Sequence, residues 1–551
     1  MKRRHRRLTA FGLGTGVMIA AVAGGSQAAF AVDPDDLESR VTVEGVMTHL
    51  TALQTIADAN DGNRAIGTSG YEASGQYIEQ VLTAAGYTPV RQDFQATTQK
   101  IDAFSITLLG TTTDLTTPQP QRIPMEGTPA TDAAGIVGAP LVAPATATGC
   151  DEAEWGGVSA VGAVAVISRG ICSFAEKSAA AAAAGASAAL IYNNEEGPLQ
   201  GTLGEQVPGL VPTVGLTQAE GAAVVAALGS ATPPTVDLQL QETTTTVDTF
   251  NIIAETPTGN STNTVMLGAH LDSVPEGPGI NDNGSGSAAI LETAVQLAAS
   301  GPLNNQVRFA WWGAEEVGLV GSAHYVEDLA ENNPAELEEI ATYLNFDMVA
   351  SPNYVISVYD ADQSTFEAPV EVPEGSIATE QAFTDYFDAS GQAWIDTAFD
   401  SRSDYDAFIS YGVPASGLFT GADEVKTPEQ VALFGGTAGI TQDPNYHSAG
   451  DNLGNVNQEA LGIMLGAIAS VTGSLANDTS AINGVVTAPV PTPTPTPTVA
   501  PAGTGPVDPQ LAATGAADGA ASGTIAGSVL MLGLGLVLAV RRRRAQGASA
   551  E

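Results

Sequence analysis

Apolar and polar residues alternate in blocks along the chain, and from residue 250 onward these blocks predict strands and helices in turn. Near-continuous apolar runs, typical of strands buried on both faces, occupy 264–270, 306–313 and 341–350. Runs with apolar spacings of three and four, typical of amphipathic helices, follow at 288–300 and 317–330. This alternation predicts an α/β fold, a three-layer αβα sandwich around a largely parallel mixed sheet.

The same domain is expected to begin earlier in the chain and to be interrupted. Residues 43–94 predict two amphipathic helices around the loop Asn63–Gly70, with a strand-rich region after them. The next segment differs, with a buried strand at 161–170, an alanine-rich helix in KSAAAAAAGASAA and a strand in ALIYNN. We therefore expect a main domain in two pieces, with a β-rich domain inserted between them; the boundaries are 32–114, 115–235 and 236–485.

The two ends of the chain have the composition of targeting segments. Basic residues, an apolar run and a small-residue site ending at Ala31 predict a signal peptide over 1–31. An uncleaved membrane anchor is the alternative. Near the other end, the Pro/Thr-rich stretch 486–510 cannot pack a core and predicts an extended spacer.

Residues 511–551 contain LAATG, an apolar span at 524–540 and the basic block Arg541–Arg544. A short apolar span followed by arginines is typical of a stop-transfer segment. The three parts in this order resemble a sortase wall-sorting signal of the LAxTG type found in high-GC Gram-positive bacteria. The resemblance implies that sortase is a partner that cleaves after Thr514 and links the protein to the cell wall. A plain C-terminal membrane anchor is the alternative, and both place the protein at the cell surface.

The charge of the chain narrows the choice of partners. The formal net charge is −42, and residues 32–514 are still more acidic, with 10 basic and 59 acidic residues. Such a field repels nucleic acid and anionic lipid, which we do not expect as partners. Acidic clusters make calcium a further candidate ion, although no EF-hand spacing is present.

The segment 115–235 contains both cysteines of the chain, Cys150 and Cys172. In an exported protein they are expected to form a disulfide, with two free thiols as the alternative. This segment resembles the protease-associated domain, on the strength of GC at 149–150, RGxCxF at 169–174, Lys177, GA at 185–186, IYNN at 191–194 and VPTVGLT at 211–217. That module has no catalytic residues, so we expect it to shape access to a neighbouring site.

Histidines and carboxylates gather where the predicted strands end, which is where α/β sheets place their sites. They are His270 and Asp272 at the end of the first strand, Asp282 in the next loop, Glu315 and Glu316 after the second strand, Asp347 after the third, and His447 in a later loop, where Tyr446 precedes it. Singly, each has an ordinary explanation, such as a turn or a solvated face. Together they predict a two-metal site, because zinc binds histidine and carboxylate, and a shared carboxylate lets two metals lie ~3.5–4 Å apart.

At this point the chain resembles the zinc aminopeptidases of the aminopeptidase/glutamate-carboxypeptidase family over residues 43–110 and 240–480. The motifs that carry the resemblance are NRAIGTSGYEAS, AHLDSV, GINDNGSGSAAILE, WWGAEEVGLVGS, LNFDMVASPN, RSDYDAF, GVPASGLFTGAD and DPNYHSAGDN. An inserted protease-associated domain is also found in that family. The resemblance implies a peptidase that acts on peptide or protein substrates and holds two Zn²⁺ per chain.

Carried over residue by residue, the resemblance implies a complete ligand set. His270, Asp282 and Asp347 would hold one zinc, and Asp282 would bridge to a second zinc held by Glu316 and His447. The resemblance also implies a cis peptide bond between Asp282 and Asn283.

It assigns roles to four further residues. Glu315 would be the general base, and Asp272 would orient His270. The Tyr446 hydroxyl would stabilise the oxyanion, with simple packing as the alternative. Arg402 matches an arginine near the substrate pocket, and a structural salt bridge is its alternative role.

One motif departs from the family. Relatives often have a disulfide around the last histidine, written CYHxxCD, where this chain has Asn445 and Gly450. We therefore expect a looser loop around His447 and weaker binding of the second zinc.

Three functions stay open on the sequence. An extracellular aminopeptidase is favoured. A carboxypeptidase or dipeptidase with the same metals is the alternative within the family. A non-catalytic ectodomain is disfavoured because such members have lost ligands that this chain retains.

Overall fold

The computed structural model describes residues 32–117, 120–194, 196–204 and 208–486. The expected signal peptide, nearly all of the spacer and the expected sorting signal lie outside these residues. Two domains, a main one in two pieces and an inserted one, are formed by the described residues.

The main domain is built on a mixed sheet with the strand order β13-β12-β14-β11-β9-β10-β8. Neighbours β9, β10, β11 and β14 are parallel, as are β12 and β13, whereas β8 and β12 pair antiparallel with β10 and β14. The strands are β8 (Thr235–Glu255), β9 (Asn260–His270), β10 (Asn305–Trp312), β11 (Ile340–Phe346), β12 (Ser357–Tyr359), β13 (Ile395–Thr397) and β14 (Ala415–Phe419). The three central strands fall where the apolar runs predicted them.

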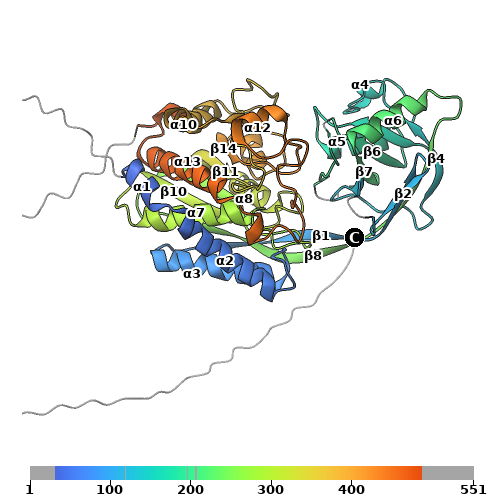
Figure 1. Ribbon diagram of the computed structural model, residues 1–551. Helices are drawn as coiled ribbons and strands as arrows, with labels where there is room; N and C mark the ends of the chain where they lie inside the picture. The colour runs from blue at the N-terminus through green and yellow to red at the C-terminus, as the bar shows by residue number, and fades with distance from the viewer. Residues whose placement is uncertain (1–31, 118–119, 195, 205–207, 487–551) are drawn as a thin grey trace, which may run out of the picture. The chain divides into compact units, whose positions relative to one another are not determined.

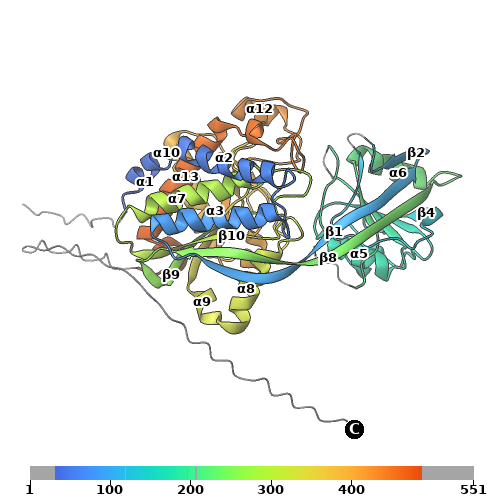
Figure 2. The ribbon, with the colours of Figure 1, turned by 90° about the horizontal axis from the view of Figure 1, so that it is seen from below.

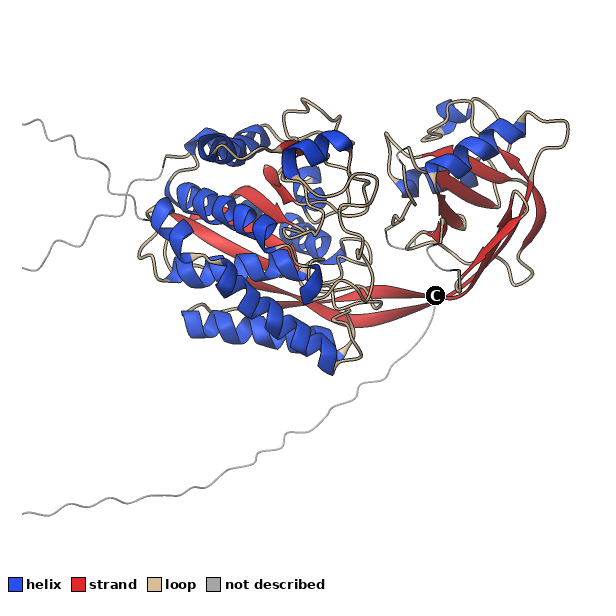
Figure 3. Cartoon of the chain, viewed as in Figure 1, coloured by secondary structure: helices blue, strands red, loops and turns tan. Residues whose placement is uncertain are grey.

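Both faces of this sheet are covered by helices, because successive side chains of a strand point to opposite faces (Figures 1 and 3). Val265, Leu267 and Ala269 of β9 pack into the larger core, whereas Met266 packs into a second core on the other face. The helices of the larger core are α1 (Pro34–Arg40), α2 (Val43–Ala59), α3 (Ser69–Ala85), α7 (Gly284–Ala298), α10 (Gly375–Ser390) and α13 (Gln458–Asn477). Those of the second core are α8 (Val320–Asn332), α9 (Pro334–Glu338) and α11 (Tyr405–Ser410). The predicted three-layer sandwich is confirmed.

A long antiparallel ribbon joins the main sheet to the inserted domain (Figure 2). Strand β1 (Val90–Leu108) pairs with β8 from Val90 opposite Ile253 to Leu108 opposite Val236. The other strands of the inserted domain are β2 (Thr111–Asp114), β3 (Arg122–Pro124), β4 (Ile136–Val142), β5 (Val164–Ser168), β6 (Ala188–Tyr192) and β7 (Thr213–Leu216). Its helices are α4 (Glu152–Trp155), α5 (Phe174–Ala183) and α6 (Gln218–Leu228). The predicted β-rich inserted domain is therefore present.

The predicted disulfide between Cys150 and Cys172 is confirmed, with an S–S distance of 2.04 Å. Beside it the Lys177 ammonium donates to the backbone carbonyls of Thr148 and Gly170 at 2.8 and 2.7 Å. The alanine-rich helix, however, is shorter than its composition predicts. It ends at Ala183, because Gly185 has a φ of 92° and the following alanines enter β6.

Three short elements complete the main domain: α12 (Pro428–Phe434), the 3₁₀ helix η1 (Leu453–Asn455) and α14 (Ser480–Asn483). Among the described residues, α13 alone is long and apolar enough to cross a membrane. Most of it is buried in the larger core, so its apolar character is that of a core helix.

Candidate metal centre

The carboxyl ends of β9, β10 and β11 bring the predicted residues together in one buried place. His270 is the last residue of β9, and Asp347 is the first residue after β11. Glu315 and Glu316 follow β10 in a turn where Ala314 has a φ of 62° and Leu319 a φ of 61°. This turn explains why α8 begins at Val320, three residues later than the apolar pattern predicts.

Asp282 and His447 are supplied by loops. Asp282 precedes α7, whose first turn is capped by the Asn283 side chain on the backbone N–H of Gly286 at 2.9 Å. The Asp282–Asn283 peptide bond is cis, as the resemblance implies. His447 lies in the loop between α12 and α13 with a φ of 53°.

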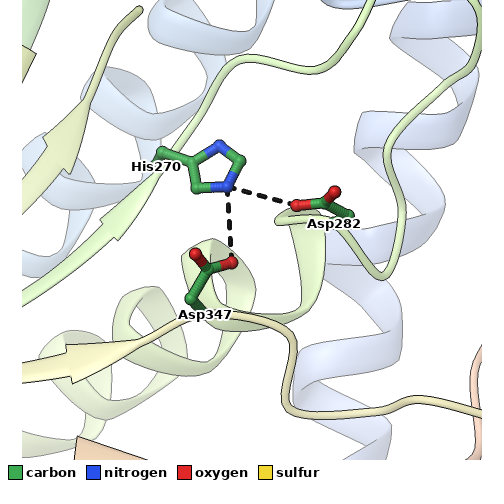
Figure 4. A group of neighbouring side chains, drawn as sticks. All are labelled: His270, Asp282 and Asp347. Carbon is green, nitrogen blue, oxygen red and sulfur yellow. Dashed lines mark ion pairs between the residues drawn. The ribbon is translucent and has the colours of Figure 1, made fainter. Parts of the chain in front are cut away.

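The first group contains His270, Asp282 and Asp347, whose side chains converge in Figure 4. His270 Nε2 lies 3.2 Å from Asp282 Oδ1 and 3.4 Å from Asp347 Oδ1. The second group contains Asp282, Glu316 and His447. His447 Nε2 lies 3.0 Å from Glu316 Oε2 and 3.2 Å from Asp282 Oδ2. Asp282 therefore presents one carboxylate oxygen to each group.

The donor atoms fit metal ions better than they fit one another. Asp282 Oδ2, Glu316 Oε1 and Asp347 Oδ1 are shielded from solvent and have no hydrogen-bond partner among the described residues. A buried carboxylate oxygen without a partner is costly unless a cation or donor compensates it. Two histidines and three carboxylates form the kind of donor set that zinc prefers.

Asp272 lies behind the first group and is almost fully buried. Its Oδ1 is 3.6 Å from His270 Nδ1, the ring nitrogen that faces away from Asp282 and Asp347. Its two oxygens also accept the backbone N–H groups of Glu315 at 3.3 Å and Glu316 at 3.4 Å. One carboxylate thus positions the end of β9 against the turn that follows β10.

Burial raises the pKa of Glu315 well above its ordinary value. His270 opposes the rise, and the carboxylates of Asp347 and Asp404 add to it. Burial likewise raises the pKa of Tyr446 well above its usual range, so its hydroxyl stays protonated and able to donate. The Tyr446 ring stacks on that of His447 with centroids 3.8 Å apart.

Arg402 lines the space in front of the site, but its guanidinium is engaged elsewhere. Its Nη1 lies 3.0 Å from Asp423 Oδ1 and 3.9 Å from Glu424 Oε1. The arrangement agrees with the alternative that the sequence left open, a structural salt bridge.

Arg64 holds the loop from Leu271 to Gly279, and sequence reasoning assigned it no role. The residue is fully buried and donates from its guanidinium to the backbone carbonyls of Leu271, Pro278 and Gly279. Its backbone N–H also donates to Ser273 Oγ at 2.9 Å. Arg64 lies inside the NRAIGTSGYEAS motif, which could have marked it as a functional residue. Nothing in the sequence, however, shows which loop its side chain contacts.

The loop around His447 is held by a polar network of aspartates and asparagines. Asp451 accepts the backbone N–H groups of Asn281 at 2.8 Å and Asp282 at 2.9 Å. Asn455 donates to Asp443 and Asp451, and Asn445 donates to Asn455 at 2.7 Å. The loop expected to be loose therefore has several buried hydrogen bonds that tie it to the metal-side loop.

Ser403 and Asp404 also escaped the sequence analysis, although both lie in RSDYDAF. Ser403 Oγ donates to Asp347 Oδ2 at 2.6 Å. Asp404 is buried, and burial raises its pKa to about 7. Ser403 therefore positions Asp347, and Asp404 adds a further buried carboxyl group whose charge interacts with that of Asp347.

A third acidic group, Asp360, Asp362 and Glu380, lies away from this site. Its carboxylates accept backbone N–H groups of their own loop, including those of Ala361 and Thr365. These hydrogen bonds show that the carboxylates stabilise the backbone of the loop after β12. Calcium binding stays a prediction.

Two cavities open onto the centre. One of about 480 Å³ is lined by Glu315, Glu316, Asp347 and Tyr446 among others. The other, of about 220 Å³, is lined on the metal side by Glu315 and His447 and on the inserted-domain side by Glu126, Ile171 and Phe174. The inserted domain thus contributes to the walls around the site.

Comparison with known proteins identifies this arrangement. The peptidase family M28 pattern matches residues 251–472, and the PA domain pattern matches residues 137–224. A probable lipoprotein aminopeptidase of Mycobacterium tuberculosis is 44% identical over 470 residues, which cover 84% of this chain and 90% of the relative. The chain belongs to peptidase family M28. With this family and such relatives it is a metallo-aminopeptidase, a hydrolase, and the predicted protease-associated domain is confirmed.

Solved structures of the family share the fold. An aminopeptidase from Aneurinibacillus sp. strain AM-1 is 25% identical, with a TM-score of 0.61 over 84% of this chain and 98% of that one. A zinc aminopeptidase from Bacillus subtilis is also 25% identical, with a TM-score of 0.51 over 79% of this chain and 97% of that one.

The role of Arg64 leads to a first prediction. Arg64→Met should lower the free energy of unfolding by about 3 kcal/mol or more, because it leaves three buried carbonyls without a donor. It should also weaken the affinity for Zn²⁺, because the loop before Asp282 loses its anchor. Denaturant unfolding and competition with a chelator measure the two effects, with Lys100→Met on the exposed surface as the control. A folded Arg64→Met protein with unchanged Zn²⁺ affinity would contradict the anchoring role.

Proposed function

We propose that this M28 metallo-aminopeptidase is a surface-anchored di-zinc enzyme that removes N-terminal residues from peptides with an activated water. The observation that carries the proposal is the carboxylate of Asp282, which offers one oxygen to the His270 group and the other to the His447 group. Zinc is supported by the donor set and by the Bacillus subtilis zinc aminopeptidase, and a count of two by the two groups that share Asp282.

In this proposal His270, Asp282 and Asp347 hold one zinc, and Asp282, Glu316 and His447 hold the other. Bound there, the ions would supply Lewis acidity and a water that loses its proton near neutral pH. Asp272 fixes the orientation of His270 through the far ring nitrogen, which lies 3.2 Å from the backbone carbonyl oxygen of Asp272 and 3.6 Å from its carboxylate Oδ1.

Glu315 is placed to act as the general base. Its Oε2 lies 3.8 Å from His270 Nε2, beside the first metal group, and it lines both cavities that open onto the centre. Its raised pKa suits a carboxylate that takes a proton from water and returns it to the leaving amine. The Tyr446 hydroxyl, which lines the same cavities, would donate to the developing oxyanion.

The charge of the site supports an aminopeptidase over a carboxypeptidase. Glu315, Glu316 and Asp347 line the larger cavity and attract the ammonium group of a peptide's N-terminus. A C-terminal carboxylate would favour a free guanidinium there, and the two in the lining already face carboxylates, Arg402 facing Asp423 and Arg169 facing Asp400. Glu315 and Asp347 are thus the proposed acceptors for the substrate amine.

The surface location rests on the ends of the chain and on one relative. The signal segment, the Pro/Thr-rich spacer and LAATG support export and sortase-dependent wall attachment. The Mycobacterium tuberculosis relative is named a lipoprotein, a class of protein held at the cell surface.

The role of Glu315 is tested by Glu315→Gln. This variant should keep both metals and lose most of its turnover, by about 10²–10⁴-fold, because it removes the group that shuttles the proton. Metal content and hydrolysis of an aminoacyl-p-nitroanilide are measured together, with exposed Glu338→Gln as the control. Near-normal turnover in a metal-loaded variant would place the base elsewhere.

The anchor is tested by Thr514→Ala, which removes the residue before the proposed cleavage point. The full-length variant should leave the wall fraction and appear in the membrane or the medium, as shown by fractionation after wall digestion. Thr494→Ala in the spacer is the matched control. Unchanged wall attachment of Thr514→Ala would mean that another anchor holds the protein.

A further inference from the structure

The cavity of about 480 Å³ beside the metal centre has two kinds of wall. Part of its lining is apolar, with the side chains of Met348, Val355, Tyr359, Ile395 and Phe419. In an aminopeptidase the side chain of the N-terminal residue occupies the cavity next to the metals. The walls of this cavity therefore determine which N-terminal residue the enzyme prefers, an argument that rests on the proposed function.

The rest of the lining is rich in carboxylates. Besides the metal groups and Glu315, four carboxylates and two guanidinium groups line the cavity; they are Glu367, Asp396, Asp400 and Glu424, and Arg169 and Arg402. Arg169 Nη2 lies 3.8 Å from Asp400 Oδ2, so the charges of these two residues offset each other. The cavity therefore retains an excess of negative charge after its own ion pairs are counted.

Glu424, whose side chain is 29% exposed, is one of the carboxylates in this lining without a close guanidinium partner. Arg402 lies closer to Asp423 than to Glu424, at 3.0 Å against 3.9 Å. The Oε2 atom of Glu424 is shielded from solvent and has no hydrogen-bond partner among the described residues. Asp396, which also lines the cavity, has an Oδ1 atom that is likewise shielded from solvent and without a hydrogen-bond partner among the described residues.

Burial raises the pKa of Glu424 to about 7, and the neighbouring Asp423 carboxylate adds to the rise. A cation bound beside Glu424 would lower this pKa and supply the missing hydrogen bond. An apolar side chain in the same place would leave the buried oxygen without a partner.

We propose that Glu424 is a specificity-determining residue that selects peptides with lysine or arginine at the N-terminus. The aliphatic stem of such a side chain lies along the apolar walls, and its cationic end reaches the Glu424 carboxylate. Hydrogen bonds between charged groups are the stronger ones in proteins, so the effect on selectivity is measurable.

The test compares two substrates that differ in one charged group. Lysyl-p-nitroanilide and norleucyl-p-nitroanilide share a four-carbon stem, and only the first carries an ammonium. The zinc-loaded protein should prefer the lysyl substrate in kcat/KM by about 10- to 100-fold, the range expected for one buried charge-assisted hydrogen bond.

A variant then assigns the preference to Glu424. Glu424→Gln keeps the size of the side chain and should reduce the lysyl-to-norleucyl ratio toward one. Glu429→Gln makes the same chemical change on the exposed surface of α12, away from the cavity lining, and should preserve the ratio. If Glu424→Gln does not fold, the ratio measured on the unchanged protein still decides whether the preference exists, and the smaller neutral variant Glu424→Ala tests its assignment to Glu424 in the same assay.

The possible results distinguish a failure of the proposed specificity from a failure of the proposed function. Hydrolysis of the norleucyl substrate at least as fast as the lysyl one would overturn the preference and leave the aminopeptidase standing. A lysyl preference that survives in folded Glu424→Gln would overturn the assignment to this residue. Failure to hydrolyse either substrate would overturn the proposed function together with the inference drawn from it.

Discussion

The structure depends on one constraint: several buried negative charges must be held together at the end of a sheet. Asp272, Asp282, Glu316 and Asp347 are each at most 8% exposed, and two histidines lie among them. Like charges a few ångströms apart repel strongly where water is scarce. Cations bound by the two groups would relieve that repulsion, and the position of Asp282 in both groups would allow one carboxylate to serve both.

The surrounding fold can be understood as the support for this arrangement. The parallel strands bring His270, the Glu315–Glu316 turn and Asp347 to one edge. Arg64 and Asp451 then hold the two sides of the loop that carries Asp282, one through its carbonyls and the other through its N–H groups. A loop rich in glycine, serine and proline becomes rigid because its backbone groups have fixed, buried partners rather than because of its composition.

The sequence predicts much of this because apolar periodicity and strand ends are local signals. The runs at 264–270, 306–313 and 341–350 identify the central strands, and the polar residues after them identify the metal edge. The roles of Arg64 and Asp451 could not be predicted, because their hydrogen-bond partners are distant in the chain. The partners of Arg64 lie 207 to 215 residues away, and those of Asp451 lie 169 to 170 residues away. The same holds for the polar network around His447, because hydrogen bonds among Asn445, Asn455 and Asp443 leave no pattern comparable to a pair of cysteines.

The central claim is that Asp282 bridges two zinc ions. The most direct measurement is the anomalous diffraction of a zinc-loaded crystal, collected above and below the zinc absorption edge. If Asp282 bridges two zinc ions, two anomalous peaks are expected ~3.5–4 Å apart, one on each side of the Asp282 carboxylate, with His270 and Asp347 at one and Glu316 and His447 at the other. A single fully occupied peak, or a second peak that does not contact Asp282, would contradict it.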